Sequence, residues 1–180
     1  LIIAGPKKAN LRELIEKKAI EKGIKINEIR FREVGRQLLY KNKKLNKITI
    51  TKEYYEASKG IEIFLAAEDI ENDILIGLLR LRIPSEKPHR AEIDTRTALV
   101  RELHIYGPQV PIGSYINDAW QHKGWGMKLL RIAEEIARFE FNCNKIYVLS
   151  GVGVREYYRK QGYRKLSELP YMVKELKNDI

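Results

Sequence analysis

The chain has 180 residues, 44% of them hydrophobic, which suits one domain, or one domain with an extension, around a proper core. It contains no run of 18 apolar residues, so we expect no membrane span, and its opening Leu-Ile-Ile-Ala-Gly is too short for the apolar part of a signal peptide. A single cysteine, Cys143, excludes an internal disulfide and a cysteine-rich metal site and fits a cytoplasmic protein without a metal centre. Because the first residue is Leu1 rather than Met, we expect a part of a longer polypeptide.

The net charge of +10 is concentrated in the first third of the chain. Residues 1–60 carry +9, whereas residues 61–180 carry +1. Such a segment is either a solvated surface or a surface that binds a polyanion, with nucleic acid as the first candidate and an acidic membrane as the second. We therefore divide the chain into a basic extension over residues 1–60 and a folded domain over residues 61–180.

The extension has one strong helical pattern, at residues 7–22. Residues 24–34 alternate apolar and polar types in part and predict a strand or an extended segment. Residues 36–47 are polar and basic, which predicts either contacts with a phosphate backbone or a flexible charged loop. A short β-branched strand at residues 48–51 and a helical turn at residues 52–59 complete this part.

The remaining two thirds predict a sheet with helices, because apolar alternation gives way to helical spacing. In order, we predict strands at 61–67 and 74–83, a loop at 84–96, a strand at 97–106, a helix at 128–140, a strand at 145–150, a short helix at 154–161 and one or two strands within 163–176. The first two strands form an antiparallel hairpin, with Gly77 at a bulge. The strand at 145–150 is of the parallel type.

The most informative stretch is QHKGWGM at residues 121–127, which runs into the long helix. Backbone N–H groups converge at such a turn and the helix dipole adds positive charge, so a phosphate is favoured there. Gly124 and Gly126 let a ligand approach the backbone without a Cβ in the way. We expect a phosphate-bearing small ligand between the strand at 97–106 and this turn. The competing interpretation is an ordinary loop, because a lone Gly-x-Gly lacks the third glycine of a dinucleotide fingerprint.

The order of the elements favours the ligand. Strands, then Gln-x-x-Gly-x-Gly, an amphipathic helix, a strand and a Tyr-Tyr pair resemble the acetyl-coenzyme A site of the GCN5-related N-acetyltransferase superfamily. The resemblance implies an α/β (α+β) fold with a mixed, mostly antiparallel sheet and flanking helices. It also implies that the turn holds the pyrophosphate and that the preceding strand pairs with the pantetheine arm.

Longer motifs extend the likeness to one family, that of the catalytic subunit of the Elongator complex. They are REVG at 32–35, LIGLLRLR at 75–82, VRELHIYG at 100–107, QHKGWGM at 121–127, SGVGVREYYRK at 150–160 and PYMVK at 170–174. That family joins a radical S-adenosylmethionine domain to an acetyltransferase-like domain, and this chain resembles only the second domain and its connecting segment. Cysteines are common in the family near Asn27 and Phe31 and are absent here. Trp125 replaces its usual phenylalanine or tyrosine.

The resemblance implies an acetyl-CoA-dependent enzyme that makes a carboxymethyl-type group at C5 of the wobble uridine (U34) of certain tRNAs. The radical module, with S-adenosylmethionine and a [4Fe–4S] cluster, attaches the group, and this chain holds neither. We expect the chain alone to bind acetyl-CoA and to hydrolyse it slowly. The alternatives are a protein lysine N-acetyltransferase and a non-catalytic RNA-binding module on the same fold.

Site residues follow from the same resemblance. The residues implied to contact acetyl-CoA are Glu102, Leu103, His104, Ile105, Gln121, Lys123, Gly124, Trp125, Gly126, Met127 and Tyr158. The catalytic candidates are Glu102, His104, Tyr157 and Tyr158. The residues expected to contact tRNA phosphates are Arg30, Arg32, Arg36, Lys41, Lys43, Lys44 and Lys47.

Each candidate also has a purely structural interpretation. Leu103 and Ile105 fit the core side of a strand, and His104 fits a packed, hydrogen-bonded histidine. Glu102 could activate a water or pair with a neighbouring arginine. A tyrosine hydroxyl would donate to the departing sulfur; we assign Tyr158 to coenzyme A and Tyr157 to its neighbourhood, with an aromatic pair that anchors the short helix as the alternative.

Overall fold

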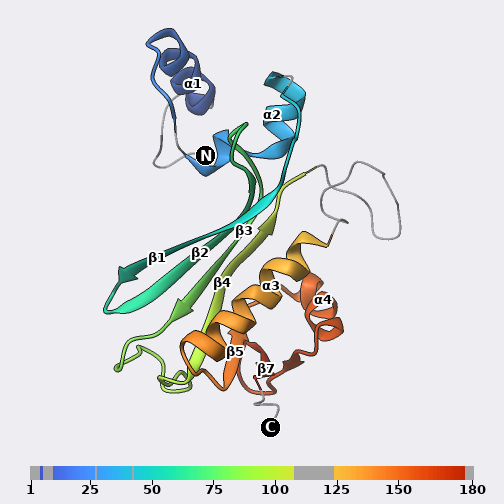
Figure 1. The fold of residues 1–180 in the computed structure, drawn as a ribbon. Coiled ribbons are helices and arrows are strands. Elements are labelled where there is room, and N and C mark those ends of the chain that lie inside the picture. Colours follow the sequence, from blue (N-terminus) through green and yellow to red (C-terminus); the bar gives the residue numbers. More distant parts are fainter. Residues whose placement is uncertain (1–4, 6–9, 27, 42, 108–123, 177–180) are drawn as a thin grey trace.

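The fold is a seven-stranded sheet with helices against it and at one end of it (Figure 1). The structure is a computed structural model that describes residues 5, 10–26, 28–41, 43–107 and 124–176. The strands are β1 Thr49–Ala57, β2 Gly60–Asp69, β3 Ile74–Ile83, β4 Thr97–Ile105, β5 Lys145–Val148, β6 Arg164–Lys165 and β7 Met172–Glu175. The α-helices are α1 Leu11–Glu21, α2 Val34–Lys41, α3 Trp125–Glu135 and α4 Arg155–Lys160. The shorter helical segments are the 3-10 turns η1 Ile29–Phe31 and η4 Val152–Val154 and the π-helical η3 Ile136–Glu140.

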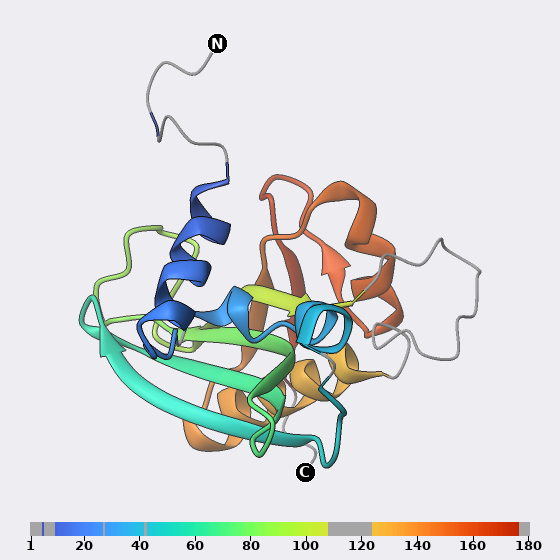
Figure 2. The same ribbon diagram turned by 90° about the horizontal axis from the view of Figure 1, so that it is seen from above.

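The strand order is β1-β2-β3-β4-β5-β7-β6. All neighbouring strands are antiparallel except β4 and β5, which are parallel. The predicted hairpin, the predicted parallel strand and the mixed, mostly antiparallel sheet are therefore confirmed. Figure 2 shows α1 and the loop over residues 84–96 on one side of the sheet and α4 on the other.

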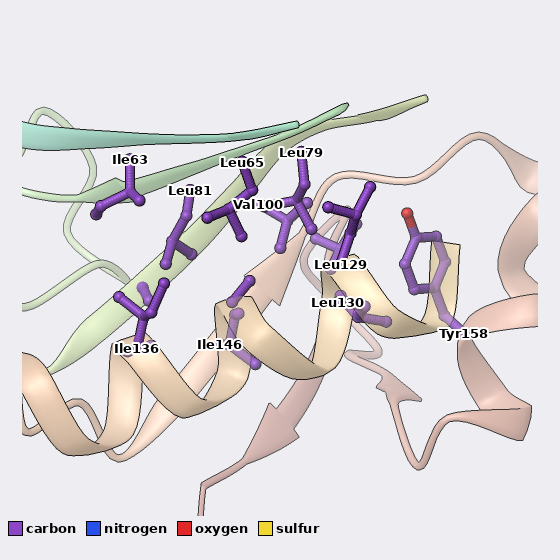
Figure 3. Packing of buried hydrophobic residues seen from close by; sticks show 14 of the residues in the cluster. Ile63, Leu65, Leu79, Leu81, Val100, Leu129, Leu130, Ile136, Ile146 and Tyr158 are labelled. Carbon is purple, nitrogen blue, oxygen red and sulfur yellow. The ribbon is translucent and has the colours of Figure 1, made fainter. Parts of the chain in front are cut away.

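The main core lies between the sheet and α3. In Figure 3, Leu129, Leu130 and Ile136 of α3 and η3 face the leucines of β2 and β3. The predicted stripe of this helix is confirmed, with Leu129 and Ala133 fully buried and Ile132 partly buried. Each fully buried leucine or isoleucine contributes about 2 kcal/mol relative to its exposed state, so this layer is the main source of stability.

Two bulges interrupt the register of the central strands. One lies where Ala67 pairs with Gly77 but Glu68 pairs with Leu75, so the expected irregularity is next to Gly77. The other lies in β4, where Arg80 pairs with Glu102 but Leu81 pairs with Val100. Arg101 is therefore an additional residue in β4. A bulge turns consecutive side chains toward the same face, and this one lies where the site was expected.

The structure differs from three expectations for the extension. Residues 52–59 do not form a helical turn, because β1 continues to Ala57 and a tight turn at Ser58 and Lys59, both with positive φ, leads into β2. That turn has the geometry of a two-residue hairpin loop, and pairing with β2 along all of β1 overrides the local pattern. Residues 29–31 form a 3-10 turn where a strand or an extended segment was expected, and residues 34–41 form α2, which replaces the start of the flexible charged loop that was one of two alternatives for residues 36–47.

The basic extension is hydrogen-bonded to the turn between β2 and β3. The backbone carbonyl of Arg32 accepts a hydrogen bond from the Leu75 amide at 2.7 Å, and the Arg32 guanidinium pairs with Asp73 at 2.6 Å and with a second carboxylate. The buried Asp69 carboxylate accepts the Asn46 amide at 2.7 Å. The division at residue 60 stays a prediction, although its first part supplies β1 to the sheet. Among the helices of the described residues, none is long and apolar enough to cross a membrane.

The lone cysteine gives a test of core packing. Cys143 is 3% exposed, and burial, followed by the charge of Asp94, raises the pKa of its thiol to about 11. At pH 8 the thiolate fraction is then about two orders of magnitude below that of a free cysteine with a pKa of about 8.5, so we expect Ellman's reagent to react at least 100-fold more slowly with the native chain than with the unfolded chain. Because the raised pKa favours the neutral thiol in the folded state, the thiol contributes to the free energy of unfolding. This contribution is fully present below pH 8.5 and is lost as the pH rises toward 11. A native rate equal to the unfolded rate would contradict the buried position.

Candidate functional site

The site begins where β4 and β5 separate. The two strands pair only from Thr97 with Lys145 to Val100 with Val148. β4 then continues to Ile105, while β5 has ended. Within the described part of the chain, the β5-facing edge of residues 102–105 has no strand beside it. An extended ligand with amide groups can pair with such an edge as an added strand.

The side chains of this part of β4 divide between two faces. Leu103 and Ile105 are partly buried against the main core. Glu102 is 44% exposed on the other face, with Arg80 Nη1 at 3.8 Å from its carboxylate. The His104 ring is exposed and lies 4.4 Å from that of Tyr106. Leu103 and Ile105 thus have the core position that was one interpretation of them, and Glu102 has the arginine partner that was one interpretation of it.

The glycine turn ends in the first turn of α3. Gly124 is the N-cap and has φ of 74°, a left-handed conformation that favours glycine. The first intrahelical hydrogen bond runs from the Lys128 amide to the Gly124 carbonyl at 3.0 Å. The amides of Trp125, Gly126 and Met127 therefore precede the helix's own hydrogen bonds and can bind an anion. Gln121 and Lys123, which were expected here as well, lie outside the described residues.

A cradle lies between this turn, β4 and α4. A Cβ added to Gly126 would lie 2.8 Å from the Tyr157 hydroxyl and 3.6 Å from Cγ1 of Ile105. The three residues come from α3, α4 and β4 and surround a space that only glycine leaves open. We refer to Gly126, Tyr157 and Ile105 as the glycine cradle.

Two residues of α3 and α4 each carry a buried polar atom that has no hydrogen-bond partner among the described residues. These atoms are the Tyr157 hydroxyl and the Trp125 indole N–H. Buried polar groups in proteins are nearly always hydrogen-bonded, and a ligand at the turn can supply the missing partner of the Tyr157 hydroxyl, which faces Gly126. Burial, followed by the charge of Glu134, raises the pKa of Tyr157, so its hydroxyl is protonated at neutral pH and can donate.

Tyr158 is placed differently. It is 6% exposed and belongs to the main core, with its ring centroid 5.6 Å from that of Tyr163 and 5.2 Å from that of Tyr157. Figure 3 shows its ring beside the first turns of α3. Burial, followed by Tyr157, raises the pKa of Tyr158 to about 12. The sequence indicated that the two tyrosines face different directions, and the structure places the Tyr157 hydroxyl at the glycine turn.

The basic residues that were expected to contact tRNA divide into two groups. Arg32 and Arg36 form ion pairs with carboxylates, and Lys43 Nζ donates to a backbone carbonyl at 2.5 Å. The side chain of Lys41 lies outside the described residues. The exposed members are Arg30, Lys44 and Lys47.

A charged cluster that was not predicted from the sequence lies on the face of the sheet opposite the main core. Glu62 of β2 is 1% exposed, and its carboxylate lies 2.7 Å from Arg101, 3.6 Å from Arg82 and 3.7 Å from Arg80. The alternation of Arg80 and Arg82 in β3 could have indicated a charged face, but their convergence on Glu62 depends on the strand register and on the bulge at Arg101. We call Glu62, Arg80, Arg82 and Arg101 the Glu62 cluster.

These features fit acetyl-CoA. The open edge of β4 suits the amide groups of a pantetheine arm, the free amides of α3 suit a pyrophosphate, and the glycine cradle leaves room between them. The unpaired Tyr157 hydroxyl can donate a hydrogen bond to such a ligand.

The comparisons with known proteins agree with the geometry. Residues 31–163 match the acetyltransferase (GNAT) family. The chain is 51% identical to the tRNA uridine(34) acetyltransferase of Methanocaldococcus jannaschii over 180 residues, which is 98% of this chain and 32% of that protein. It is 46% identical to human Elongator complex protein 3 over 177 residues, again 98% of this chain and 32% of that protein.

A solved structure is similar over nearly the whole chain. The archaeal Methanocaldococcus infernus Elp3 with an N-terminal deletion superposes with a TM-score of 0.82 at 48% identity, over 97% of this chain and 41% of that chain. The chain spans about a third of the length of the curated relatives named above. From the sequence match, the sheet and the cradle together, the chain belongs to the acetyltransferase (GNAT) family.

Proposed function

We propose that the chain is the acetyl-CoA-binding part of an enzyme that modifies C5 of the wobble uridine (U34) of tRNA. The observation that carries the acetyl-CoA part is the glycine cradle, where unpaired polar atoms, free helix amides and an open strand edge meet. The tRNA part is supported by the relatives, which are named for tRNA uridine(34) acetyl transfer and for the Elongator complex.

Each group at the cradle has a distinct task in this proposal. The backbone of residues 102–105 pairs with the pantetheine arm, and the amides of Trp125, Gly126 and Met127 bind the pyrophosphate. Acetyl-CoA, when bound, supplies an acetyl group activated as a thioester. The Tyr157 hydroxyl donates a hydrogen bond to the thioester sulfur and so favours its departure as a thiol, while Tyr158 supports the ring of Tyr157 from the core.

The face of β4 opposite the core supplies the remaining candidates. The exposed Glu102 carboxylate, close to Arg80, orients a water for hydrolysis, and His104 lies two residues further along the same face. The tRNA phosphates are contacted by the exposed side chains of Arg30, Lys44 and Lys47. The contacts within the chain that Arg32, Arg36 and Lys43 make hold the backbone of this surface in place. Lys41 belongs to the same proposed set.

The whole reaction needs more than this chain. We assign the attachment of the acetyl-derived group to a radical S-adenosylmethionine domain with a [4Fe–4S] cluster elsewhere in the polypeptide. The single cysteine of this chain cannot hold such a cluster, which needs three or four cysteine ligands. A cytoplasmic location, where tRNA is modified, belongs to the same proposal.

Calorimetric titration of the chain with acetyl-CoA and with a non-hydrolysable thioether analogue tests the proposal. We expect both ligands to bind with micromolar affinity and acetyl-CoA to be hydrolysed slowly. No binding at high micromolar ligand would overturn the proposal and favour an RNA-binding module without coenzyme. Acetyl transfer to a lysine peptide that does not respond to tRNA would instead favour a protein lysine N-acetyltransferase.

The two tyrosines are distinguished by matched variants. We expect Tyr157→Phe to lower kcat for acetyl-CoA hydrolysis about 10- to 100-fold with little change in KM, because the hydroxyl acts on the departing sulfur rather than on binding. Tyr158→Phe should change kcat less than threefold. The measurement is coenzyme A release by chromatography, with thermal unfolding of each variant as the control. The reverse order of effects would assign the donor to Tyr158.

A further inference from the structure

A basic cleft lies at the end of the sheet away from α1 and α2. It has a volume of about 600 Å³ and is formed by the turn after β1, the loop over residues 84–96 and the exposed face of β3 and β4. Its basic lining residues, which define the basic cleft below, are Arg82, Lys87, His89, Arg90 and Arg101. Its remaining walls are largely apolar and include Pro84, Pro88 and Leu99.

The charge of the cleft is of one sign. Four of its lining side chains are permanently cationic, and none of the lining residues is a carboxylate. The carboxylate beneath the cleft, Glu62, is 1% exposed and is shared by three arginines, so it neutralises the cluster only in part. A second carboxylate, Glu92, lies 3.5 Å from Arg90 at the rim. Lys87 is exposed and the Arg101 side chain is 52% exposed, so both cations reach the solvent.

Hydrogen bonds hold two arginine side chains of the cleft in fixed positions. Arg82 donates to the backbone carbonyls of Ala57 and Ser58, which fixes its guanidinium against the turn after β1. Arg101 donates to Glu62 at 2.7 Å and is held on this face by the bulge in β4. Two arginine guanidinium groups are therefore oriented before any ligand arrives. Oriented guanidinium groups bind phosphate oxygens through paired N–H donors.

The bulge also connects the cleft with the proposed acetyl site. Arg101 and the following Glu102 both make their contacts on the same face, and Arg80 bridges the Glu62 and Glu102 carboxylates at 3.7 and 3.8 Å. Glu102 begins the open edge of β4. A chain-like anion in the cleft can thus continue along this face toward the acetyl group.

We propose that the basic cleft binds a phosphodiester of a single-stranded RNA segment whose neighbouring nucleotide lies over Glu102 and the open edge of β4. The cations match the phosphate, and the apolar walls accommodate an unstacked base, as is usual for single-stranded RNA sites. The position of the neighbouring nucleotide rests on the proposed function, whereas phosphate binding in the cleft does not. The 3′-phosphate of coenzyme A is the other anion with matching chemistry, and the test separates the two.

The test uses the 180-residue chain with Lys87→Gln and Arg90→Gln combined, two changes that leave the Glu62 cluster intact. Binding of a tRNA anticodon-arm RNA is measured by fluorescence anisotropy from low to moderate salt. We expect the dissociation constant to rise at least tenfold and the slope of its logarithm against that of salt to fall by about 0.7, the value for one single-strand phosphate contact. Acetyl-CoA affinity should stay unchanged.

The matched control removes the same charge from the opposite face. Lys52→Gln with Arg131→Gln, both exposed and on the α3 side of the sheet, should weaken RNA binding less than twofold. Equal losses in the two double variants, or an unchanged dissociation constant in the cleft variant, would overturn the proposal. A loss of acetyl-CoA affinity in the cleft variant would also overturn it and assign the cleft to coenzyme A. Failure of the wild-type chain to bind acetyl-CoA refutes the proposed function and leaves the RNA measurement interpretable.

Discussion

Replacing Gly126 with alanine is expected to weaken acetyl-CoA binding at least tenfold while the chain remains folded. The new Cβ would lie 2.8 Å from the Tyr157 hydroxyl, well inside van der Waals contact, and would occupy the cradle where the ligand passes. Tyr157 cannot move away freely, because its ring is partly buried against the core and packs edge-on to Tyr158. Calorimetric titration gives the affinity, and circular dichroism confirms the fold.

Two controls accompany this variant. Gly151→Ala should have no effect on affinity, because a Cβ there meets nothing within 4 Å. Combining Gly126→Ala with Tyr157→Phe removes the clashing oxygen and leaves contacts of 3.6 and 3.7 Å, so the part of the lost affinity that is due to that clash should return. If the double variant stays weak, the ligand itself fills the space of the Cβ. An unchanged affinity in Gly126→Ala would contradict the site.

Replacing Glu62 with alanine is expected to lower the free energy of unfolding by about 2–3 kcal/mol. The substitution removes the carboxylate that Arg80, Arg82 and Arg101 share and leaves three cations close together. Breaking a fully buried ion pair costs about 3–5 kcal/mol, and the value is smaller here because Arg80 and Arg101 reach solvent. Urea unfolding at constant pH gives the measurement.

The matched control for Glu62 is Glu53→Ala. Glu53 is exposed in β1 opposite Phe64 of β2, which is two residues from Glu62 and on the same face of the sheet, and its loss should cost less than about 0.5 kcal/mol. Raising the salt concentration should reduce the difference between Glu62→Ala and wild type, because salt screens the repulsion among the arginines. A loss below 1 kcal/mol for Glu62→Ala would show that the cluster is solvated and does not depend on its carboxylate.

The fold was predictable wherever one periodicity dominates. The apolar alternation of β2 and β3 and the helical stripe of α3 are long and unambiguous, and both were predicted correctly. The segment over residues 52–59 was not, because its lysines, glutamates and tyrosines suit an exposed strand and an exposed helix alike. Pairing with β2 decided between them, and that interaction is not local.

The glycine turn could be recognised from the sequence, but the directions of the side chains around it could not. Glycines before a helix indicate an anion site, and the resemblance adds the coenzyme. Consecutive helix residues differ by about 100° in direction, so the Tyr-Tyr pair had to diverge, but which hydroxyl faces Gly126 depends on how α4 packs against Tyr163. The additional residue at Arg101 had no local signal either. It emerges only when β3 and β4 are aligned.

The early separation of β4 from β5 has a thermodynamic consequence. In the described part of the chain, the strand pairing between a four-stranded and a three-stranded part of the sheet is limited to the four pairs from Thr97 with Lys145 to Val100 with Val148. A coenzyme lying along the remaining edge of β4 would act as a surrogate strand that joins the two parts, and it would bind only the native state. At a hundredfold excess over its dissociation constant, such a ligand adds about 2.7 kcal/mol to the free energy of unfolding. The resistance of this domain to unfolding would then follow the acetyl-CoA concentration of the cell.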